Sequence, residues 1–382
     1  MVFCIAIGSV HLVHAFTLDR IVEYREVSFT SPRWPEELSG YVIALITDVH
    51  AFPNEQLAQL VIELNSRNID LVLLGGDFST LGNRYRESLG ILSEIEARDG
   101  IFGVEGNHDD YVMLFASMEA NGIVPLSNSG VRIHESFFLA GLPDLWNRRE
   151  IVSIYEAVSE ADPYDFVLLL SHNPDVTMQQ PTHAVDMVLS GHTHGGHITF
   201  FGVWAPFLTF SRSVSYYGQH FMTGWSMSRD GVPVYVSNGL GGYNSIPRVF
   251  ARPQVILITM QHGDTLETNV YVSFLLSGFG IMVMFFITWN IFTFALFAND
   301  KKRAEKDKTR IGETALISYS FLLGGPGAYL SMRVFRHKTD KIKFKLLIPL
   351  SIIVDFAVLS FLAFMVRQDF ISDIIRMLWS LI

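Results

Sequence analysis

Short apolar runs recur along the first 260 or so residues, and nearly all of them end at a glycine or a polar residue. Five such runs are Val42–Thr47, Leu71–Leu74, Ile101–Val104, Phe166–Leu170 and Met187–Leu189. Runs this short, rich in Val, Ile, Leu and Phe and bounded by turn residues, are typical of buried β-strands. The pattern therefore predicts a buried sheet.

Amphipathic stretches separate the first of these strands and predict helices. Asn54–Asn65 carries apolar residues at helical spacing, and so does Arg86–Glu96. Further strands are predicted at Phe137–Ala140, Val234–Ser237 and Val255–Met260. Strand, loop and helix in alternation indicate an α/β fold, in which ligands bind in the loops beyond the carboxyl ends of the strands.

The last third of the chain has long apolar stretches in place of short ones. Residues 270–297 contain no charged side chain, and about 20 apolar residues suffice to cross a bilayer, so we predict a transmembrane helix there. Residues 346–366, interrupted only by Asp355, are a second predicted span. Thr314–Met332 is a third candidate, but glycines and a proline at 324–327 break it, which suits either a span or a re-entrant hairpin.

Two basic loops lie between these stretches, at residues 301–310 and 333–345. Positively charged loops stay on the cytoplasmic side, so a full crossing by 314–332 would put one of them on the wrong face. We therefore favour the re-entrant hairpin. The basic residues direct the topology or, as the sharper alternative, bind anionic lipids. This arrangement places residue 270, and the domain before it, on the outer face of the cell membrane.

The charge balance divides the chain at the same place. Residues 1–269 contain no lysine and have 14 Arg against 30 acidic residues, whereas residues 270–382 have 14 basic against 8 acidic residues. We expect a domain over 20–265 and a transmembrane domain over 270–382 with two to three spans, preceded by a membrane anchor at 1–18. The acidic domain argues against nucleic acid as a partner, and a single cysteine excludes thiolate zinc sites.

Motifs rich in histidine and acid follow the predicted strands directly. They read Asp48-Val49-His50, Gly75-Gly76-Asp77, Gly106-Asn107-His108-Asp109, Ser171-His172-Asn173 and Gly191-His192-Thr193-His194-Gly195-Gly196. One such motif alone is weak evidence. Together they supply the donors of two neighbouring metal sites and one spare histidine, which is what a two-metal hydrolase requires.

These motifs, in this order, closely resemble the calcineurin-like metallophosphoesterase superfamily. The segments 195–196, 237–241 and 247–248 are similar to its bacterial membrane-associated branch, although His197 stands where that branch more usually has glutamine. The resemblance covers roughly residues 38–262 and implies a four-layer α/β/β/α sandwich. The tail, through short motifs near residues 300, 311, 324 and 337, resembles a family of small, uncharacterised bacterial integral membrane proteins.

The resemblance also implies the ligands of two divalent cations, which would be Mn, Fe or Zn. The first cation would take Asp48, His50, Asp77 and His194, and the second Asp77, Asn107, His172 and His192. Asp77 would bridge the pair. The spacing of His192 and His194 agrees with this division, because side chains at i and i+2 leave a strand on the same side.

Other residues near these motifs have two interpretations each. His108 is not needed as a ligand, and we expect it to protonate the leaving-group oxygen or to hold the phosphate as imidazolium. Asp109 orients His108 or is only a turn residue. Arg248 and Arg252 hold a second phosphate or cap strands. The aromatic stretch over 200–210 packs in the core, or forms a lip that dips into the bilayer or holds acyl chains.

Asp355 needs a partner if it lies within a span. It is either a functional group or is satisfied by Arg310 or by a helix-packing hydrogen bond.

The combined features predict a membrane-anchored enzyme that hydrolyses a phosphate ester or pyrophosphate through a metal-bridging hydroxide. Because tethering brings the site to the bilayer, we expect a lipid-linked or envelope-precursor substrate. The alternative is a membrane transport or lipid-handling protein in which the phosphoesterase domain is regulatory. A soluble nucleotide or nucleic-acid hydrolase is disfavoured by the acidic domain and the predicted spans.

Overall fold

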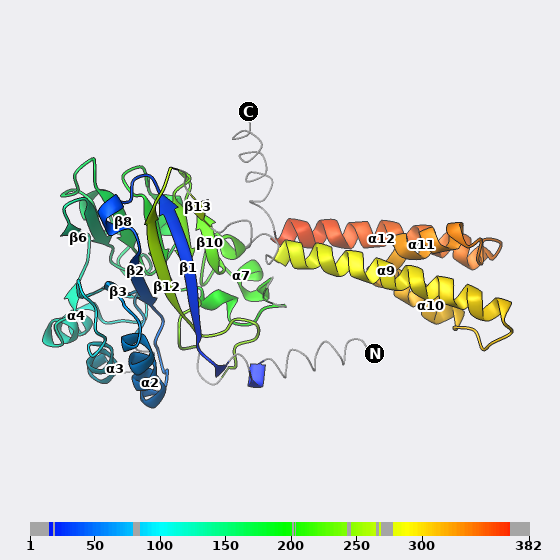
Figure 1. Cartoon of the computed structure of the whole chain (residues 1–382), viewed down its shortest axis with the longest axis horizontal. Helices are drawn as coiled ribbons and strands as arrows, with labels where there is room; N and C mark the ends of the chain where they lie inside the picture. Colours follow the sequence, from blue (N-terminus) through cyan, green and yellow to red (C-terminus); the bar gives the residue numbers. More distant parts are fainter. Residues whose placement is uncertain are drawn as a thin grey trace. The chain divides into compact units, whose positions relative to one another are not determined.

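A computed structural model describes residues 15–17, 20–78, 85–200, 202, 204–242, 246–264, 267–268 and 278–366 (Figure 1). The chain divides into two compact units, Met1–Ser273 (unit 1) and Phe274–Ile382 (unit 2). Nearly all of the predicted anchor at 1–18, and the first part of the predicted span at 270–297, lie outside the described residues.

Two mixed β-sheets form the centre of unit 1. The larger has the strand order β13-β1-β12-β2-β3-β4-β5. Its strands are β1 (Glu23–Ser31), β2 (Tyr41–Ile46), β3 (Leu71–Leu74), β4 (Ile101–Gly103), β5 (Val124–Pro125), β12 (Gln254–His262) and β13 (Glu267–Thr268). The smaller has the order β10-β11-β9-β8-β7-β6. Its strands are β6 (Ser129–His134), β7 (Phe137–Gly141), β8 (Phe166–Leu170), β9 (Met187–Ser190), β10 (Gly224–Met227) and β11 (Pro233–Val236).

The strands that precede the polar motifs run parallel within each sheet. β2, β3 and β4 are parallel neighbours in the larger sheet, and β8 and β9 are parallel neighbours in the smaller one. Because parallel strands end at a common edge, the loops that follow them emerge side by side.

Alternation of side chains along the strands produces two cores. In β2, Ile43 and Leu45 point into the core between the sheets, whereas Ala44 and Ile46 point toward the helices. The side chains of all four are fully buried. A slip of one residue would exchange the two sets, so the register of β2 is strongly specified.

Helices cover the outer faces of both sheets. α2 (Asn54–Asn65), α3 (Tyr85–Leu92) and α4 (Tyr111–Ala120) pack on the larger sheet and lie together in Figure 1. The short helices α5 (Ile154–Ala157) and α6 (Val176–Gln179) pack on the smaller sheet. The predicted α/β class is therefore confirmed.

Four shorter segments are also seen in the described part of unit 1. They are η2 (Glu36–Leu38), η3 (His194–Gly196), α7 (Pro206–Phe210) and η4 (Gly218–Phe221).

Unit 2 is helical in its described part. Its elements are α9 (Gly278–Glu305), α10 (Glu313–Tyr319), the π-helical turn η5 (Ser320–Gly324), α11 (Gly325–Val334) and α12 (Ile342–Val366). The predicted spans at 270–297 and 346–366 overlap α9 and α12. Over the residues that the structure describes, however, no helix has both the length and the hydropathy needed to cross a bilayer, so the predicted spans are not confirmed.

The segment from α10 to α11 turns back instead of continuing as one helix. Asp300, near the end of α9, contacts Arg310 just before α10 at 3.6 Å. The same carboxylate contacts His337 and Lys338 just after α11, at 2.8 and 2.9 Å. Both ends of the segment therefore meet at the same end of α9, which is the arrangement of a hairpin.

Two polar side chains satisfy the broken backbone at the hairpin tip. Asp355 of α12 accepts hydrogen bonds from the N–H groups of Leu323 and Gly325, at 3.1 and 2.7 Å. Asn290 of α9 donates to the carbonyl of Leu323 at 2.8 Å. Asn290 lies about 15 Å along the helix from Asp300, given 1.5 Å per residue. Of the two interpretations of Asp355, the structure supports the helix-packing hydrogen bond.

Replacement of Asp355 by alanine should open the hairpin tip locally, because two backbone N–H groups lose their acceptor. A buried unsatisfied donor costs about 1–3 kcal/mol, so amide exchange over residues 320–327 should accelerate about tenfold or more. Hydrogen–deuterium exchange mass spectrometry of the full-length protein measures this. Asp340→Ala removes an exposed acid before α12 and is the matched control. Equal exchange rates in both variants would refute this role for Asp355.

Candidate metal centre

The motif loops bring the predicted metal ligands together. Asp48 and His50 follow β2, Asp77 follows β3, and Asn107 follows β4 in the larger sheet, and His172, His192 and His194 follow β8 and β9 in the smaller. Two sets of acid and imidazole groups form, each with donor atoms within 4.8 Å of one another: Asp48, His50, Asp77 and His194 in one set, and Asp77, His172 and His192 in the other. All of these side chains are buried.

Asp77 is the residue common to both sets. Its Oδ2 lies 3.5 Å from Nε2 of His50 and 3.3 Å from Nε2 of His172, while its Oδ1 accepts a hydrogen bond from the backbone N–H of His108 at 2.8 Å. Asn107 joins the second set, since its Oδ1 lies 3.2 Å from Nε2 of His172. One carboxylate thus faces both groups of donors.

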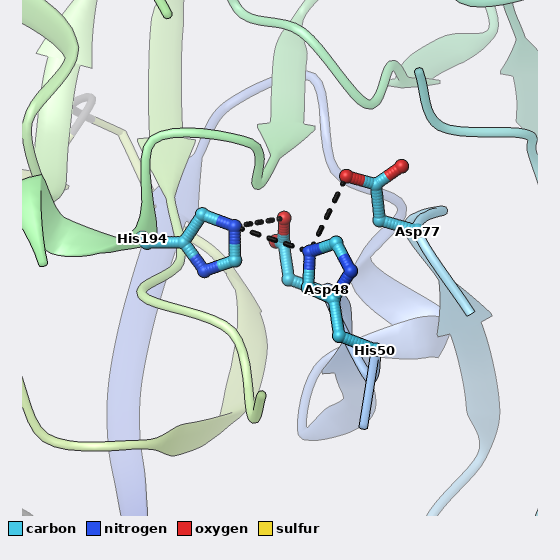
Figure 2. A group of neighbouring side chains, drawn as sticks. All are labelled: Asp48, His50, Asp77 and His194. Atoms are coloured by element: carbon cyan, nitrogen blue, oxygen red, sulfur yellow. Dashed lines mark hydrogen bonds and ion pairs between the residues drawn. The ribbon is translucent and has the colours of Figure 1, made fainter. Parts of the chain in front are cut away.

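The first set converges on a single region between its side chains (Figure 2). Nε2 of His194 lies 3.4 Å from Oδ1 of Asp48 and 3.2 Å from Nε2 of His50. The hydroxyl of Thr47 donates to Oδ2 of Asp48 at 2.8 Å, and the backbone N–H of His192 donates to the same atom at 3.0 Å. These bonds fix the carboxylate while its other oxygen faces the imidazoles.

Backbone carbonyls determine which nitrogen of two histidines is available. Nδ1 of His172 lies 2.7 Å from the carbonyl of Gly75, and Nε2 of His192 lies 2.6 Å from the carbonyl of Val214. A carbonyl can only accept, so each of these nitrogens carries the proton. The opposite nitrogens, Nε2 of His172 and Nδ1 of His192, lie 3.2 Å apart and are the atoms that a cation could bind once they are unprotonated.

The backbone is in the left-handed region at five of the seven predicted ligands. The φ angles are 52° at Asp48, 45° at His50, 58° at Asp77, 72° at His192 and 53° at His194. Such angles are uncommon for residues other than glycine and cost about 1–3 kcal/mol each, and they cluster at functional sites. The loops thus hold these side chains in position at the cost of backbone strain.

Two glycines allow the close approach of neighbouring loops. A Cβ at Gly106 would lie 2.2 Å from Oδ1 of Asp77, and one at Gly191 would lie 2.4 Å from Oδ2 of Asp48. Real side chains cannot be so close to a carboxylate. Larger residues at either position would therefore displace a predicted ligand.

Burial keeps three of the imidazoles neutral. Desolvation lowers the pKa of His50 to about 4 and that of His192 to about 3, and it holds the pKa of His194 well below its usual range. Burial also raises the pKa of Asp48 to about 6. Neutral imidazole is the form that binds a cation.

Asp77 and His172 do not follow this effect of burial, because each stabilises the charged form of the other. Burial alone would raise the pKa of Asp77, but the charge and the hydrogen bond of His172 outweigh it and lower that pKa. Burial alone would lower the pKa of His172, yet the charge of Asp77 holds it well above its usual range. A cation beside Asp77 would take the place of the proton on His172.

The two predicted catalytic residues lie in the loop after β4. His108 is half-buried, and its ring lies 5.3 Å from the ring of His50, so it stands at the edge of the first set. Asp109 is buried, and its two carboxylate oxygens accept hydrogen bonds from the backbone N–H groups of Gly106, Asp77 and Phe78, at 2.9, 2.7 and 3.0 Å.

Arg248 has a role that the sequence did not identify. Its guanidinium is buried and donates to the carbonyls of His194, Ala251 and Asn238, at 3.2, 3.0 and 2.8 Å. Its Nη2 also lies 3.3 Å from Nδ1 of His194, so Arg248 holds both the loop and the ring of His194. This differs from the hypothesis that it binds a second phosphate.

Comparison with known families identifies two segments of the chain. Residues 41–196 match the model of the family described as calcineurin-like phosphoesterase. Residues 290–344 match a family described as a protein of unknown function, DUF1294. The two matches fall in unit 1 and unit 2 respectively.

Several curated proteins are similar to this chain. A "Transmembrane protein with metallophosphoesterase domain" of Danio rerio is 26% identical over 65% of this chain and 59% of its own length. An uncharacterised metallophosphoesterase of Helicobacter pylori is 28% identical over 56% of this chain and 58% of its own length. The uncharacterised metallophosphoesterase YkuE of Bacillus subtilis is 25% identical over 63% of this chain and 86% of its own length.

The match spans a little under three fifths of the Danio rerio and Helicobacter pylori proteins. The matched residues nevertheless include the strands of the fold that precede the motif loops and the buried cluster of Asp and His. This cluster fits a dinuclear metal site. Residues 41–196 of this chain therefore match the calcineurin-like phosphoesterase family, and the bacterial relatives are named metallophosphoesterases.

Proposed function

We propose that unit 1 is a two-metal phosphoesterase that hydrolyses a phosphate ester or a pyrophosphate. The observation that carries the proposal is Asp77, which is shared by two buried sets of acid and imidazole donors. The first cation would be held by Asp48, His50, Asp77 and His194, and the second by Asp77, Asn107, His172 and His192. Mixed nitrogen and oxygen donors suit Mn, Fe or Zn.

Bound cations would supply a water of lowered pKa and would offset the negative charge of the phosphate. In the hydrolysis the oxygen of water forms a bond to phosphorus, the bond to the leaving-group oxygen breaks, and that oxygen takes a proton. His108 stands at the edge of the first set, where it can give that proton or contact a phosphate oxygen. Its backbone N–H is already held by Asp77, which fixes its position.

Asp109 supports this arrangement by positioning. Its carboxylate ties the loop of Asp77 to the loop of Asn107 through three backbone N–H groups, so it acts on both sets without contacting the substrate. The orientation of His108 by Asp109, which the sequence suggested, stays a prediction.

We further propose that unit 2 associates with the cell membrane and that unit 1 lies outside the cytoplasm. Large apolar side chains of α9 and α12 are exposed, among them Ile291 at 64%, Leu346 at 67% and Ile353 at 66%. Exposed apolar surface of this extent is typical of contact with lipid or protein. The similar Danio rerio protein is named a transmembrane protein, and the basic loops favour a cytoplasmic position for residues 301–310.

Hydrolysis should require both donor sets. The full-length protein with Mn²⁺ is expected to hydrolyse an aryl phosphate diester, and Asp77→Asn should lower kcat/KM at least about 10³-fold because both cations lose a ligand. His108→Ala should lower kcat about 10²- to 10⁴-fold on esters with poor leaving groups, and less on esters with good ones. His183→Ala removes an exposed histidine of unit 1 and is the matched control.

The metal content of each variant shows whether a loss of activity comes from a lost cation or from a lost catalytic side chain. Elemental analysis should find about two cations per chain in the original protein and in His108→Ala, and about one in His192→Ala. Turnover by Asp77→Asn equal to that of the original protein would contradict the proposal, and would favour a regulatory role for unit 1.

Removal of the Asp109 carboxylate should destabilise unit 1. Asp109→Ala leaves three buried N–H groups without their acceptor, so the free energy of unfolding should fall by about 2–4 kcal/mol in urea titrations. Asp110→Ala, its neighbour, removes only the side-chain cap of α4 and should cost about 1 kcal/mol. If both variants lose the same stability, Asp109 does not join the two loops.

A reporter tests the proposed topology. Green fluorescent protein fused after residue 305 should fluoresce and alkaline phosphatase at that position should stay inactive, because the basic loop remains in the cytoplasm. The reverse pattern would place unit 1 in the cytoplasm. Full-length protein recovered only in the soluble fraction would overturn the membrane association itself.

A further inference from the structure

An apolar cavity of about 460 Å³ opens directly beside the candidate metal centre. The residues that line it include His194, Ile198, Phe207, Val214 and Ile246. We infer that this cavity receives the hydrocarbon chain of the phosphoester whose phosphate binds at the metal centre. This inference rests on the proposed function and names the class of its substrate, an ester that carries an acyl or prenyl chain.

The cavity has the size and chemistry of a site for an apolar group. Ligand sites usually measure about 300–1,000 Å³ and are lined mostly by apolar side chains. The described lining residues include no Lys, Arg, Asp or Glu. A nucleotide or a second phosphate would find no lysine or arginine among these residues, and Arg248, which was the predicted candidate, is engaged with backbone carbonyls.

The cavity and the metal centre share parts, so one molecule can occupy both. His194 is a member of the first donor set and also lines the cavity. Val214 lines it too, and its carbonyl holds Nε2 of His192 in the second set. A phosphate held between these histidines therefore has an apolar space beside it in this cavity.

The wall of the cavity is accessible from solvent. Ile198, Phe207 and Ile246 are 45%, 54% and 53% exposed although their side chains are large and apolar. Large side chains that line a cavity and remain exposed form an entrance that a chain can pass. Phe210, on the same helix α7, is 73% exposed but does not line the cavity.

A series of esters with one leaving group tests the inference. Full-length protein in detergent, loaded with Mn²⁺, is given p-nitrophenyl alkyl phosphates whose alkyl groups run from methyl to octyl. We expect kcat/KM to rise about fourfold per methylene until the cavity is filled, as burial of apolar surface requires. Affinity for alkylphosphonates of the same lengths, measured by calorimetry, should rise in parallel.

Two variants of α7 separate the cavity from the rest of the surface. Phe207→Asp places a charge on the cavity wall and should abolish the dependence on chain length. Phe210→Asp places the same charge on the same helix outside the cavity and should keep that dependence.

The outcomes distinguish the inference from the proposed function. Hydrolysis of the methyl ester with no effect of chain length would overturn the inference and leave the proposed function intact. Equal loss of the chain-length effect in both variants would also overturn the inference, since the hydrocarbon chain would then bind the exposed aromatic surface over 200–210 or the micelle. Absence of all hydrolysis, with phosphonate affinity that still depends on chain length and on Phe207, would overturn the proposed function and keep the cavity.

Discussion

A single buried carboxylate, Asp77, organises the loops of unit 1. It faces His50 and His172 with one oxygen and the backbone of His108 with the other. An ionised acid in such a place is stable only because positive charge and N–H groups surround it. Its own loop is held in turn by Asp109. The donors of both sheets therefore depend on one another through a residue that contributes to each side.

The strands make this convergence possible and the loops complete it. Parallel neighbours deliver the motif loops to a common edge, and the core between the sheets fixes the register of those strands. The last step is made by residues with positive φ, which turn side chains inward where an ordinary conformation would direct them elsewhere. The strands thus fix where each motif loop begins, and the strained loops fix the direction in which its side chains point.

Much of this architecture could be predicted from the sequence, since strands and helices with strong periodicity lie where the pattern put them. α2, β3 and β8 agree with their predicted ranges to the residue. The strands β1, β6 and β10 were not predicted, because they are only partly buried over most of their length and lack continuous apolar runs. The carbonyl of Val214 could not be predicted at all, because every residue type offers the same carbonyl group.

The hairpin of unit 2 has a consequence for how this chain is assembled. Phe286 near the start of α9 lies 6.5 Å from Phe356 toward the end of α12, ring to ring, so the two long helices run antiparallel (Figure 1). The start of α9 and the end of α12 consequently lie on the same side of the helix pair. A unit built in this way can be joined to an unrelated domain through one short connection, without rerouting the chain of either. The separate family matches of the two units, at residues 41–196 and 290–344, agree with such a joining of two modules.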